Sequence, residues 1–204
     1  MNEETNLRRC LQSVASIASE IVVVDSGSTD KTCDVAREFG AKVQHQAWLG
    51  HRDQKGVALG LCTQPWVLAL DCDEELSDQL LQSITAFFNN GDTERFDGAS
   101  MNRKTWFMGR WITHGDWYPD RKLRLLKRAH AKAGGEPEHD KFELSGPNGT
   151  TRLAGDLLHY SFRDTSHYLR KQIDFSDAFL ARERKAGKTF SLANTLFRSW
   201  WRFF

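Results

Sequence analysis

Apolar residues recur three or four positions apart at the start of the chain and then give way to a continuous apolar run. The recurring positions are Leu7, Cys10, Leu11, Val14 and Ile17. This spacing predicts an amphipathic helix over roughly residues 3–18. The run EIVVVD, residues 20–25, is rich in β-branched residues and is typical of a strand that is buried on both faces.

The alternation of helix and strand continues along the chain. A helix is predicted over residues 29–39, with Ser28 or Thr29 as its N-cap. A short strand over residues 41–46 and a helix over residues 51–62 follow.

The third predicted strand, WVLAL, leads into a helix that is capped by Ser77. The buried positions predicted for this helix are Leu80, Leu81, Ile84, Phe87 and Phe88. Such alternation predicts an α/β fold with an open, mainly parallel twisted sheet flanked by helices. Ligands bind sheets of this kind at the carboxyl ends of the strands, where Asp25 and Asp71 both stand.

Composition narrows the class of protein. The chain has 204 residues, of which 40% are hydrophobic, and a formal net charge of +1. These values argue against a disordered chain, a membrane bundle and a protein that binds nucleic acid through bulk charge. Residues 121–132 depart from this balance, with six Lys or Arg and no acid. This run is most simply a solvated face, and the alternative is a surface for an anionic acceptor or a membrane.

The four cysteines, Cys10, Cys33, Cys62 and Cys72, form no C-x-x-C pair and lie in apolar or helical contexts. We interpret them as reduced core residues of a cytosolic protein rather than as a disulfide framework. The first residues do not have the pattern of a signal peptide. No apolar run reaches the ~20 residues that a membrane-spanning helix needs.

Three acids follow the third predicted strand: Asp71, Asp73 and Glu74. Two of them flank Cys72, and both can turn toward one ligand where the strand ends. A divalent cation would offset their repulsion, and phosphate oxygens would complete its coordination shell. The alternative is that the acids simply begin the next helix, where negative charge complements the helix dipole.

The segment VVVDSGSTDKT, residues 22–32, ends a predicted strand in Asp25 and reaches a helix through a small, flexible turn. We expect Asp25 to accept hydrogen bonds from a base or a ribose, and Asp30 to cap the helix. The segment lacks both the G-x-x-x-x-G-K-[ST] phosphate loop and the G-x-G-x-x-G dinucleotide turn. ATPase and dehydrogenase functions are therefore disfavoured.

Several motifs carry a resemblance to a known family. NEETNLRRCLQSV, EIVVVDSGSTDKT and WVLALDCDEELS, in this order and at this spacing, resemble the nucleotide-sugar domain of glycosyltransferase family 2. The continuation, GRWITHGDWYPDRKLRLLKR and LLHYSFRDTSHYLRK, is similar to bacterial lipopolysaccharide core β-glucosyltransferases that act on inner-core heptose. The resemblance implies a GT-A fold, a UDP-linked or other nucleotide-linked sugar donor, Mg²⁺ or Mn²⁺, and inversion at the anomeric carbon.

The resemblance also implies roles for residues on the donor side. Asp25 would contact the nucleoside, with Ser26 beside it in the nucleotide-sugar site. Asp71 would lie near the ribose or the metal, and Asp73 would be the main metal ligand. His159 is a further candidate metal ligand, and the alternative is a partly buried histidine bonded to the backbone.

An inverting transfer needs a base that takes the proton of the acceptor hydroxyl. In the family, this acid precedes an element that carries an arginine. WYPDRKLRLLKR matches the pattern with Asp120, and Asp140 in PEHDKF is the second candidate. Arg121 and Arg124 would hold the donor diphosphate or an acceptor phosphate.

Aromatic residues gather between positions 106 and 118. Most of such a cluster serves core or loop packing. Trp117 and Tyr118 abut the predicted base, and their rings suit stacking on an acceptor sugar.

The predicted family domain covers residues 1–180, with a nucleotide-sugar half over 1–95 and an acceptor half over 96–180. Family 2 domains have a buried strand before the Glu-Glu step that stands near the start of this chain. We therefore expect that strand to be missing and an edge of the sheet to be open. Residues 181–204 form an amphipathic basic-aromatic tail, either an interfacial membrane helix or a helix that packs on further residues.

The leading hypothesis is an inverting, metal-dependent glycosyltransferase that moves a hexose onto a lipopolysaccharide inner-core or other lipid-linked saccharide. The donor would be UDP-glucose, and the enzyme would act as a peripheral protein at the inner face of the cytoplasmic membrane, without a nucleic-acid partner. Two alternatives stay open: a polyprenyl-phosphate sugar transferase of the same fold, and a truncated, non-catalytic membrane-associated binding module. The intact acids favour an enzyme, and the missing strand favours the module.

Overall fold

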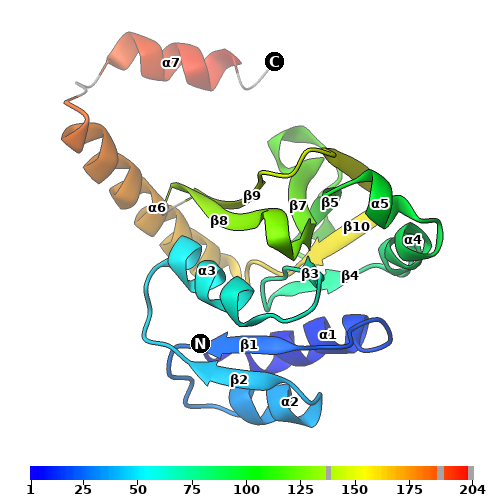
Figure 1. Cartoon of the computed structure of the whole chain (residues 1–204). Helices are drawn as coiled ribbons and strands as arrows, with labels where there is room; N and C mark the ends of the chain where they lie inside the picture. The colour runs from blue at the N-terminus through cyan, green and yellow to red at the C-terminus, as the bar shows by residue number, and fades with distance from the viewer. Residues whose placement is uncertain (137–138, 188–190, 202–204) are drawn as a thin grey trace. The chain divides into compact units, whose positions relative to one another are not determined.

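The computed structural model describes residues 1–136, 139–187 and 191–201. The chain divides into two compact units, Met1–Arg163 and Asp164–Phe204. The first unit is α/β and the second is helical (Figure 1). The second unit begins at Asp164, and the predicted start of the tail, residue 181, lies inside the long helix that covers residues 165–185.

The predicted helices and strands are present in the first part of the chain, together with two elements that the sequence did not predict. The elements are α1 Glu4–Val14, β1 Val22–Asp25, α2 Thr32–Glu38, β2 Lys42–His45, α3 His51–Leu61, β3 Trp66–Leu68, β4 Glu74–Leu76, α4 Asp78–Asn89 and α5 Asp92–Arg95. The sequence did not predict β4 and α5, and α2 begins at Thr32 rather than at Thr29. The first helix ends earlier than predicted because residues 15–17 form a turn.

Strands dominate the part of the first unit that follows α5. The elements are β5 Gly98–Phe107, β6 Arg110–Trp111, η1 Gly115–Trp117, β7 Asp120–Lys127, η2 Arg128–His130, β8 Ala131–Glu136, β9 His139–Leu144 and β10 Thr150–His159. Here η1 and η2 are short 3₁₀ helices.

The sheets are mixed rather than mainly parallel. The central sheet has the order β3-β7-β5-β10-β4, and β6 pairs with β5 at its side. Within it, only the β5–β10 ladder is parallel among the described strands. β1 and β2 form a separate parallel pair, and β8 and β9 form an antiparallel hairpin. The α/β class is confirmed, but the prediction of strand direction was wrong, because the strands after α5 return through hairpins and short loops.

The larger core lies between α4 and the central sheet. Leu80, Ile84 and Phe87 of α4 are buried against this sheet, as predicted. Ser77 caps the helix by accepting a hydrogen bond from Leu80 N at 3.3 Å. Phe88 was predicted to be buried but is 43% exposed, because only part of its ring packs, against Trp66 and Phe87 with centroids 6.0 and 5.6 Å away.

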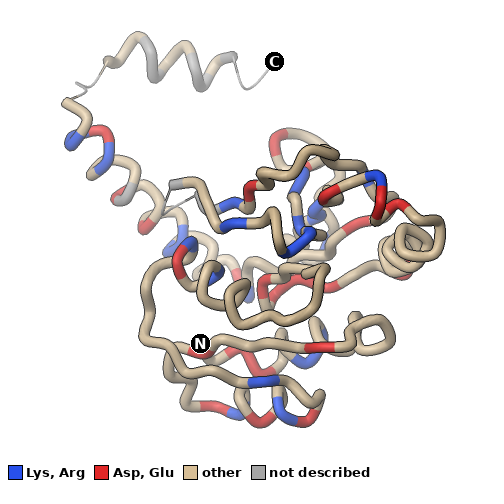
Figure 2. The backbone as a smooth tube through the Cα atoms, in the orientation of Figure 1, with Lys and Arg blue, Asp and Glu red and all other residues tan. Residues whose placement is uncertain are grey.

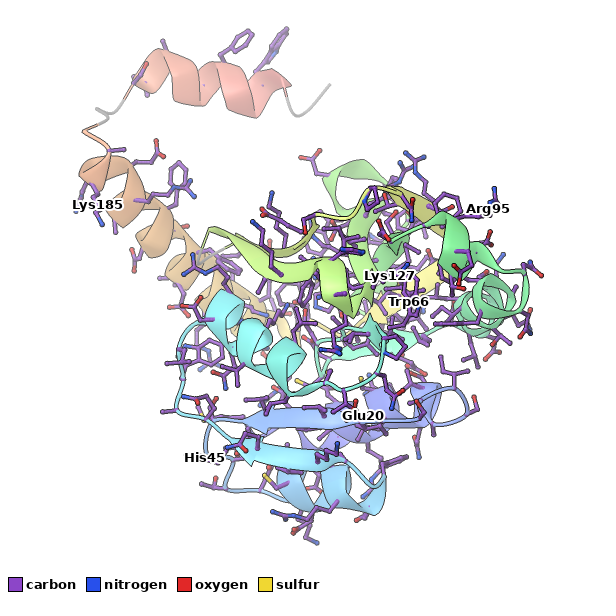
Figure 3. All side chains as sticks on the ribbon, in the orientation of Figure 1. Glu20, His45, Trp66, Arg95, Lys127 and Lys185 are labelled. Carbon is purple, nitrogen blue, oxygen red and sulfur yellow. The ribbon has the colours of Figure 1, made fainter. Side chains whose placement is uncertain are left out.

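A smaller core joins α1 and α2 to the β1–β2 pair. Its buried members are Leu7, Leu11, Val35 and Ala36. Most of β1 is half-buried rather than buried on both faces, and among the described strands β1 pairs with β2 alone. Glu20, just before β1, binds Lys42 Nζ at 2.7 Å and accepts from Thr63 N at 2.7 Å (Figure 3). It thereby ties β2 and the loop after α3 to the start of β1.

The second unit consists of α6 Thr165–Lys185 and α7 Leu192–Trp201. Asp164 caps α6 by accepting a hydrogen bond from His167 N at 2.7 Å. Both acidic and basic residues occur along α6 (Figure 2), and large apolar side chains of both helices are exposed. Within the described ranges, no helix is both long enough and apolar enough to cross a membrane.

Gly155 in β10 allows α4 to approach the sheet. Its φ is +94°, and a Cβ atom would lie 2.4 Å from Leu80 N. We expect Gly155→Ala to lower the free energy of unfolding by about 3 kcal/mol, because strain and overpacking add. Gly149→Ala is the control, since its φ is +68° but nothing lies within 4 Å. It should cost only about 1 kcal/mol in urea denaturation, and equal losses in the two variants would contradict the close approach.

Candidate active site

The acidic segment after β3 lies against the side chain of Arg124 in β7. Strand pairing produces this contact, since Ala69 N donates to Arg124 O at 2.9 Å just beyond the β3–β7 ladder. Arg124 Nη2 lies 2.6 Å from Asp71 Oδ2 and 2.6 Å from Glu74 Oε1. Arg124 and Glu74 are buried, with 5% and 1% of their surface exposed. One buried guanidinium therefore joins two of the three clustered carboxylates.

Two further cations contact the same carboxylates. Lys55 Nζ lies 2.7 Å from Asp71 Oδ1, and Arg103 Nη1 lies 3.6 Å from Glu74 Oε1. Burial tends to raise the pKa of Asp71, but Arg124 and Lys55 outweigh this effect and hold the pKa well below its usual range. Burial raises the pKa of Glu74, although Arg124 opposes the shift. In the structure two protein cations hold Asp71, the carboxylate beside which the sequence also predicts a divalent cation.

Asp73 faces the end of β10. The β4–β10 ladder places His159 opposite Glu74, and Tyr160 N donates to Asp73 O at 2.9 Å. His159 Nε2 lies 3.4 Å from Asp73 Oδ2, while His159 Nδ1 lies 3.5 Å from Thr105 Oγ1. One carboxylate and one imidazole can hold a divalent cation if ligand oxygens complete the shell. In the part of the chain that the structure describes, no three His, Cys, Asp or Glu side chains gather as a metal cluster.

Asp25 organises the turn after β1 and is 8% exposed. Its Oδ2 accepts from Gly27 N at 2.8 Å and from Ser28 N at 2.9 Å, and the Ser28 hydroxyl donates to Oδ1. Burial tends to raise the pKa of Asp25, but the hydrogen bonds from Ser28 and Gly27 outweigh it and bring the pKa to about 2. The Ser26 hydroxyl accepts from Gln54 Nε2 of α3 at 2.9 Å. Two of the predicted donor-site residues, Asp25 and Ser26, thus lie at the carboxyl end of β1.

Asp120, the first predicted base, begins β7 and is held by two cations. Arg103 Nη2 lies 2.7 Å from Asp120 Oδ2, and Lys122 Nζ lies 2.9 Å from Oδ1. Burial tends to raise the pKa of Asp120, but Arg103 and Lys122 outweigh it and lower the pKa. Arg121 is exposed beside it. The second candidate, Asp140, lies in β9, and its side chain is outside the described part of the structure.

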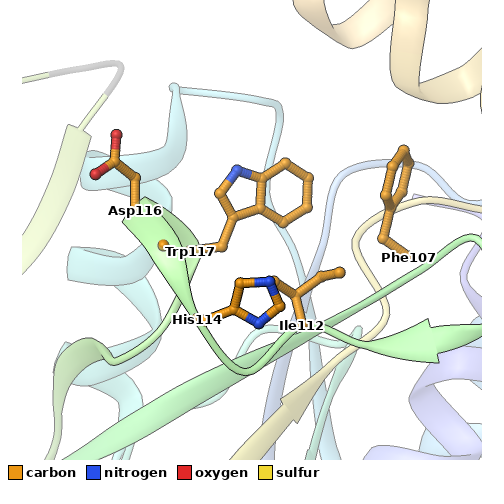
Figure 4. Close-up of a pocket in the computed structure, with 6 residues that line it drawn as sticks. Phe107, Ile112, His114, Asp116 and Trp117 are labelled. Carbon is orange, nitrogen blue, oxygen red and sulfur yellow. The ribbon is translucent and has the colours of Figure 1, made fainter. Parts of the chain in front are cut away.

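The two residues predicted to stack on an acceptor sugar have different surroundings. Tyr118 donates its hydroxyl to Asp156 Oδ1 at 2.9 Å, and Lys104 Nζ lies 2.7 Å from Asp156 Oδ2. Trp117 packs against Phe107 with ring centroids 5.4 Å apart, and both line a pocket of about 240 Å³ (Figure 4). Of the predicted pair, Trp117 lines this pocket and Tyr118 does not.

Sequence reasoning missed four charged residues of the site: Lys55, Arg103, Lys104 and Asp156. They lie in α3, β5 and β10, in segments without a motif of their own. The available signal was the basic pair within β5, a strand whose neighbouring residues point to opposite faces. Such a pair places one cation on each side of the sheet, but it does not reveal which acid each cation meets.

Arg124→Met is expected to lower the free energy of unfolding by about 3–5 kcal/mol near neutral pH, because it leaves buried carboxylates without their cation. The pKa of Asp71 is lowered by folding. Its ion pairs therefore stabilise the wild type above the unfolded value of about 4, and this contribution is lost as the pH falls through the folded pKa. The difference between variant and wild type should shrink in urea denaturation below about pH 4.

Arg128→Met is the matched control for this substitution. Arg128 is exposed, and its Nε donates to the Gln64 carbonyl at 2.9 Å. Its loss should change the free energy of unfolding by about 0.5 kcal/mol or less. A loss in Arg124→Met as small as in this control would show that the buried ion pairs do not stabilise the fold.

Comparison with known proteins shows similarity to glycosyltransferases. An uncharacterized glycosyltransferase of Rickettsia conorii is 44% identical over 95 residues, which is 47% of this chain and 34% of the relative. The lipopolysaccharide core biosynthesis glycosyltransferase LpsC of Rhizobium meliloti is 28% identical over 194 residues, 92% of this chain and 70% of LpsC. The crystal structure of S. aureus TarS 1–349 has a TM-score of 0.48 at 22% identity, covering 63% of this chain and 44% of TarS.

The match to the Rickettsia relatives spans about a third of their length. The family model described as glycosyl transferase family 2 matches residues 1–141, which is more than half of the chain. The chain therefore belongs to glycosyl transferase family 2.

Proposed function

We propose that this chain acts as an inverting, metal-dependent glycosyltransferase that moves glucose from UDP-glucose onto a lipopolysaccharide inner-core or other lipid-linked saccharide. The observation that carries the proposal is the placement of Asp73 beside His159, next to the cation-bound acids at the strand ends, in a chain of this family. The acceptor class follows LpsC, whose name assigns it to lipopolysaccharide core biosynthesis. The choice of glucose as the donor sugar rests on the resemblance of GRWITHGDWYPDRKLRLLKR and LLHYSFRDTSHYLRK to lipopolysaccharide core β-glucosyltransferases.

The donor would lie between the turn after β1 and the acidic segment. Asp25 holds the turn in shape through its own hydrogen bonds, and Ser26 would contact the nucleoside beside it. Lys55 reaches the acidic segment from α3 and would attract the diphosphate. Arg121, exposed at the start of β7, is a further candidate for a phosphate contact.

Asp73 and His159 are the residues proposed to hold Mg²⁺ or Mn²⁺. Their oxygen and nitrogen atoms suit such a cation, and they lie 3.4 Å apart. Asp71 was also predicted as a ligand, and we propose that it supports the site through Lys55 and Arg124 instead. When bound, the cation supplies Lewis-acid neutralisation of the leaving diphosphate.

In the transfer step, the acceptor hydroxyl oxygen bonds to the anomeric carbon while the bond from that carbon to the phosphate oxygen breaks. The hydroxyl proton passes to a carboxylate, and the nucleoside diphosphate leaves. Asp120 and Asp140 are the candidate bases. Arg103 and Lys122 lower the pKa of Asp120 and so weaken it as a proton acceptor. A role for Asp120 therefore requires the bound substrates to draw these cations away.

Contact with the cytoplasmic face of the membrane is proposed for the second unit. In α6, Leu169, Ile173 and Leu180 are exposed on one side of the helix, and in α7, Leu196 and Trp200 are exposed. Amphipathic helices with exposed apolar side chains and basic residues bind the membrane interface. This surface would bring the enzyme to a lipid-linked acceptor.

Asp73→Asn is expected to weaken the binding of UDP-glucose in the presence of Mn²⁺ by about tenfold or more, because it removes a proposed ligand. Calorimetry of the full chain with Mn²⁺, and again with EDTA, measures this loss. Asp78→Asn is the control, since Asp78 is an exposed acid in the first turn of α4. Donor binding that is insensitive to both EDTA and Asp73→Asn would exclude the proposed cation site.

A turnover assay on the full chain distinguishes the two candidate bases. Loss of the base should leave donor binding intact and lower kcat by about 10²–10⁴-fold. Release of UDP in the presence of truncated inner-core lipopolysaccharide is measured for Asp120→Asn and for Asp140→Asn. Wild-type turnover in both variants would show that neither carboxylate takes the proton.

A further inference from the structure

The pocket beside Trp117, named the aromatic pocket, is lined by Phe107, Ile112, His114, Gly115, Asp116 and Trp117. Its walls are set by a tight hairpin between β5 and β6. The two loop residues, Met108 and Gly109, have positive φ angles of 49° and 80°. A two-residue hairpin loop of type I′ requires positive φ at both positions. Ile112 N then donates to Thr105 O at 3.0 Å, which brings the following η1 back over the end of β5.

Two of the lining residues, Phe107 and Trp117, are aromatic, and their ring centroids lie 5.4 Å apart. Phe162 does not line the pocket, but its ring packs against both, with centroids 5.6 Å from Phe107 and 6.1 Å from Trp117. Figure 4 shows the Trp117 ring between Asp116 and Phe107, with His114 and Ile112 on one side. The pocket therefore combines aromatic faces with an imidazole and a carboxylate at its rim.

The residues in and beside the aromatic pocket are close in sequence to residues of the candidate active site. Thr105, close to His159, precedes Phe107 by two positions in β5. Tyr160, bonded to the backbone of Asp73, precedes Phe162 by two positions. Because an extended chain advances at most about 3.6 Å per residue, the lining residue Phe107 and the neighbouring Phe162 lie within roughly 10 Å of Thr105 and Tyr160. Asp120 follows Trp117 at a similar separation along the chain.

The chemistry of the aromatic pocket matches one sugar ring. A pyranose presents an apolar C–H face that stacks on an indole, and hydroxyl groups around its edge that bond to carboxylate and imidazole groups. The volume of about 240 Å³ is below the roughly 300–1,000 Å³ of sites for drug-sized ligands, so it suits one ring. The donor-site residues Asp25 and Ser26 lie at the end of β1, in the other half of the unit.

We infer that the aromatic pocket binds one pyranose ring of the saccharide acceptor, stacked on Trp117 with its hydroxyl groups toward His114 and Asp116. This inference rests on the proposed transferase function and adds to it a subsite that positions the acceptor. The ring in the pocket is a neighbour of the ring that receives the sugar. The pocket residues thereby contribute to the choice of acceptor and take no part in proton transfer.

The test is saturation-transfer NMR of the full chain with methyl β-glucopyranoside and methyl α-mannopyranoside as probes, and with cyclohexanol as an apolar comparison. The pyranosides should receive saturation through their ring C–H groups. Trp117→Ala should weaken this binding by about tenfold, and Trp117→Phe should restore most of it, because an aromatic face remains. Asp116→Asn should weaken the binding of the pyranosides and leave the binding of cyclohexanol unchanged.

Trp48→Ala is the matched control. Trp48 is 54% exposed and packs edge-on against His51 at 4.8 Å, so it reproduces an exposed Trp–His pair outside the pocket. Its loss should leave the pyranoside signal intact. Equal binding of cyclohexanol and pyranosides, both insensitive to Asp116→Asn, would identify a purely apolar pocket and overturn the inference.

Calorimetry with UDP-glucose separates this inference from the proposed function. If UDP-glucose binds but the pyranosides receive no NMR saturation, the subsite is overturned and the transferase proposal stays in place. If the pyranosides receive saturation that depends on Trp117 but UDP-glucose does not bind, the result supports a saccharide site and counts against the transferase proposal.

Discussion

The buried guanidinium of Arg124 is the interaction on which the candidate site depends. It lies 2.6 Å from both Asp71 and Glu74, in surroundings where an unpaired charge would be costly. Because Glu74 also accepts from Asp71 N at 2.9 Å, the segment between β3 and β4 is closed into a compact loop. That loop carries Asp73, and the pairing of β4 with β10 places His159 beside it.

Neighbouring charges link the acidic loop to Asp120, the first candidate base. Arg103 contacts Glu74 at 3.6 Å and Asp120 at 2.7 Å, so one cation bridges the acidic loop and a candidate base. A bound diphosphate would compete with these carboxylates for Arg103 and Lys55. Donor binding would then raise the pKa of Asp120 by weakening its ion pair, which would couple donor occupancy to proton acceptance.

Local patterns predicted the first part of the chain well and the remainder poorly. Up to α5, most elements have their own hydrophobic pattern, and the start of α4 is also marked by its cap, Ser77. The later strands pair with partners far away in the sequence, so their order and direction leave no local signal.

Arg124 illustrates the same limit for the candidate site. It stands in a run of basic residues that suggested a solvated or phosphate-binding face, yet it is buried while Arg121 is exposed. The sequence singled out the acid cluster, whereas the cations that contact it come from α3, β5 and β7, where no local pattern indicated them.

The most direct test is a double-mutant cycle between Arg124 and Glu74. Urea denaturation of Arg124→Met, Glu74→Gln and the double variant gives the coupling energy between the two side chains. A buried, hydrogen-bonded ion pair that organises the site predicts a coupling of about 2–3 kcal/mol, with the double variant more stable than the sum of the single losses allows. Additive losses, within about 0.5 kcal/mol, would show that Arg124 does not hold the acidic loop.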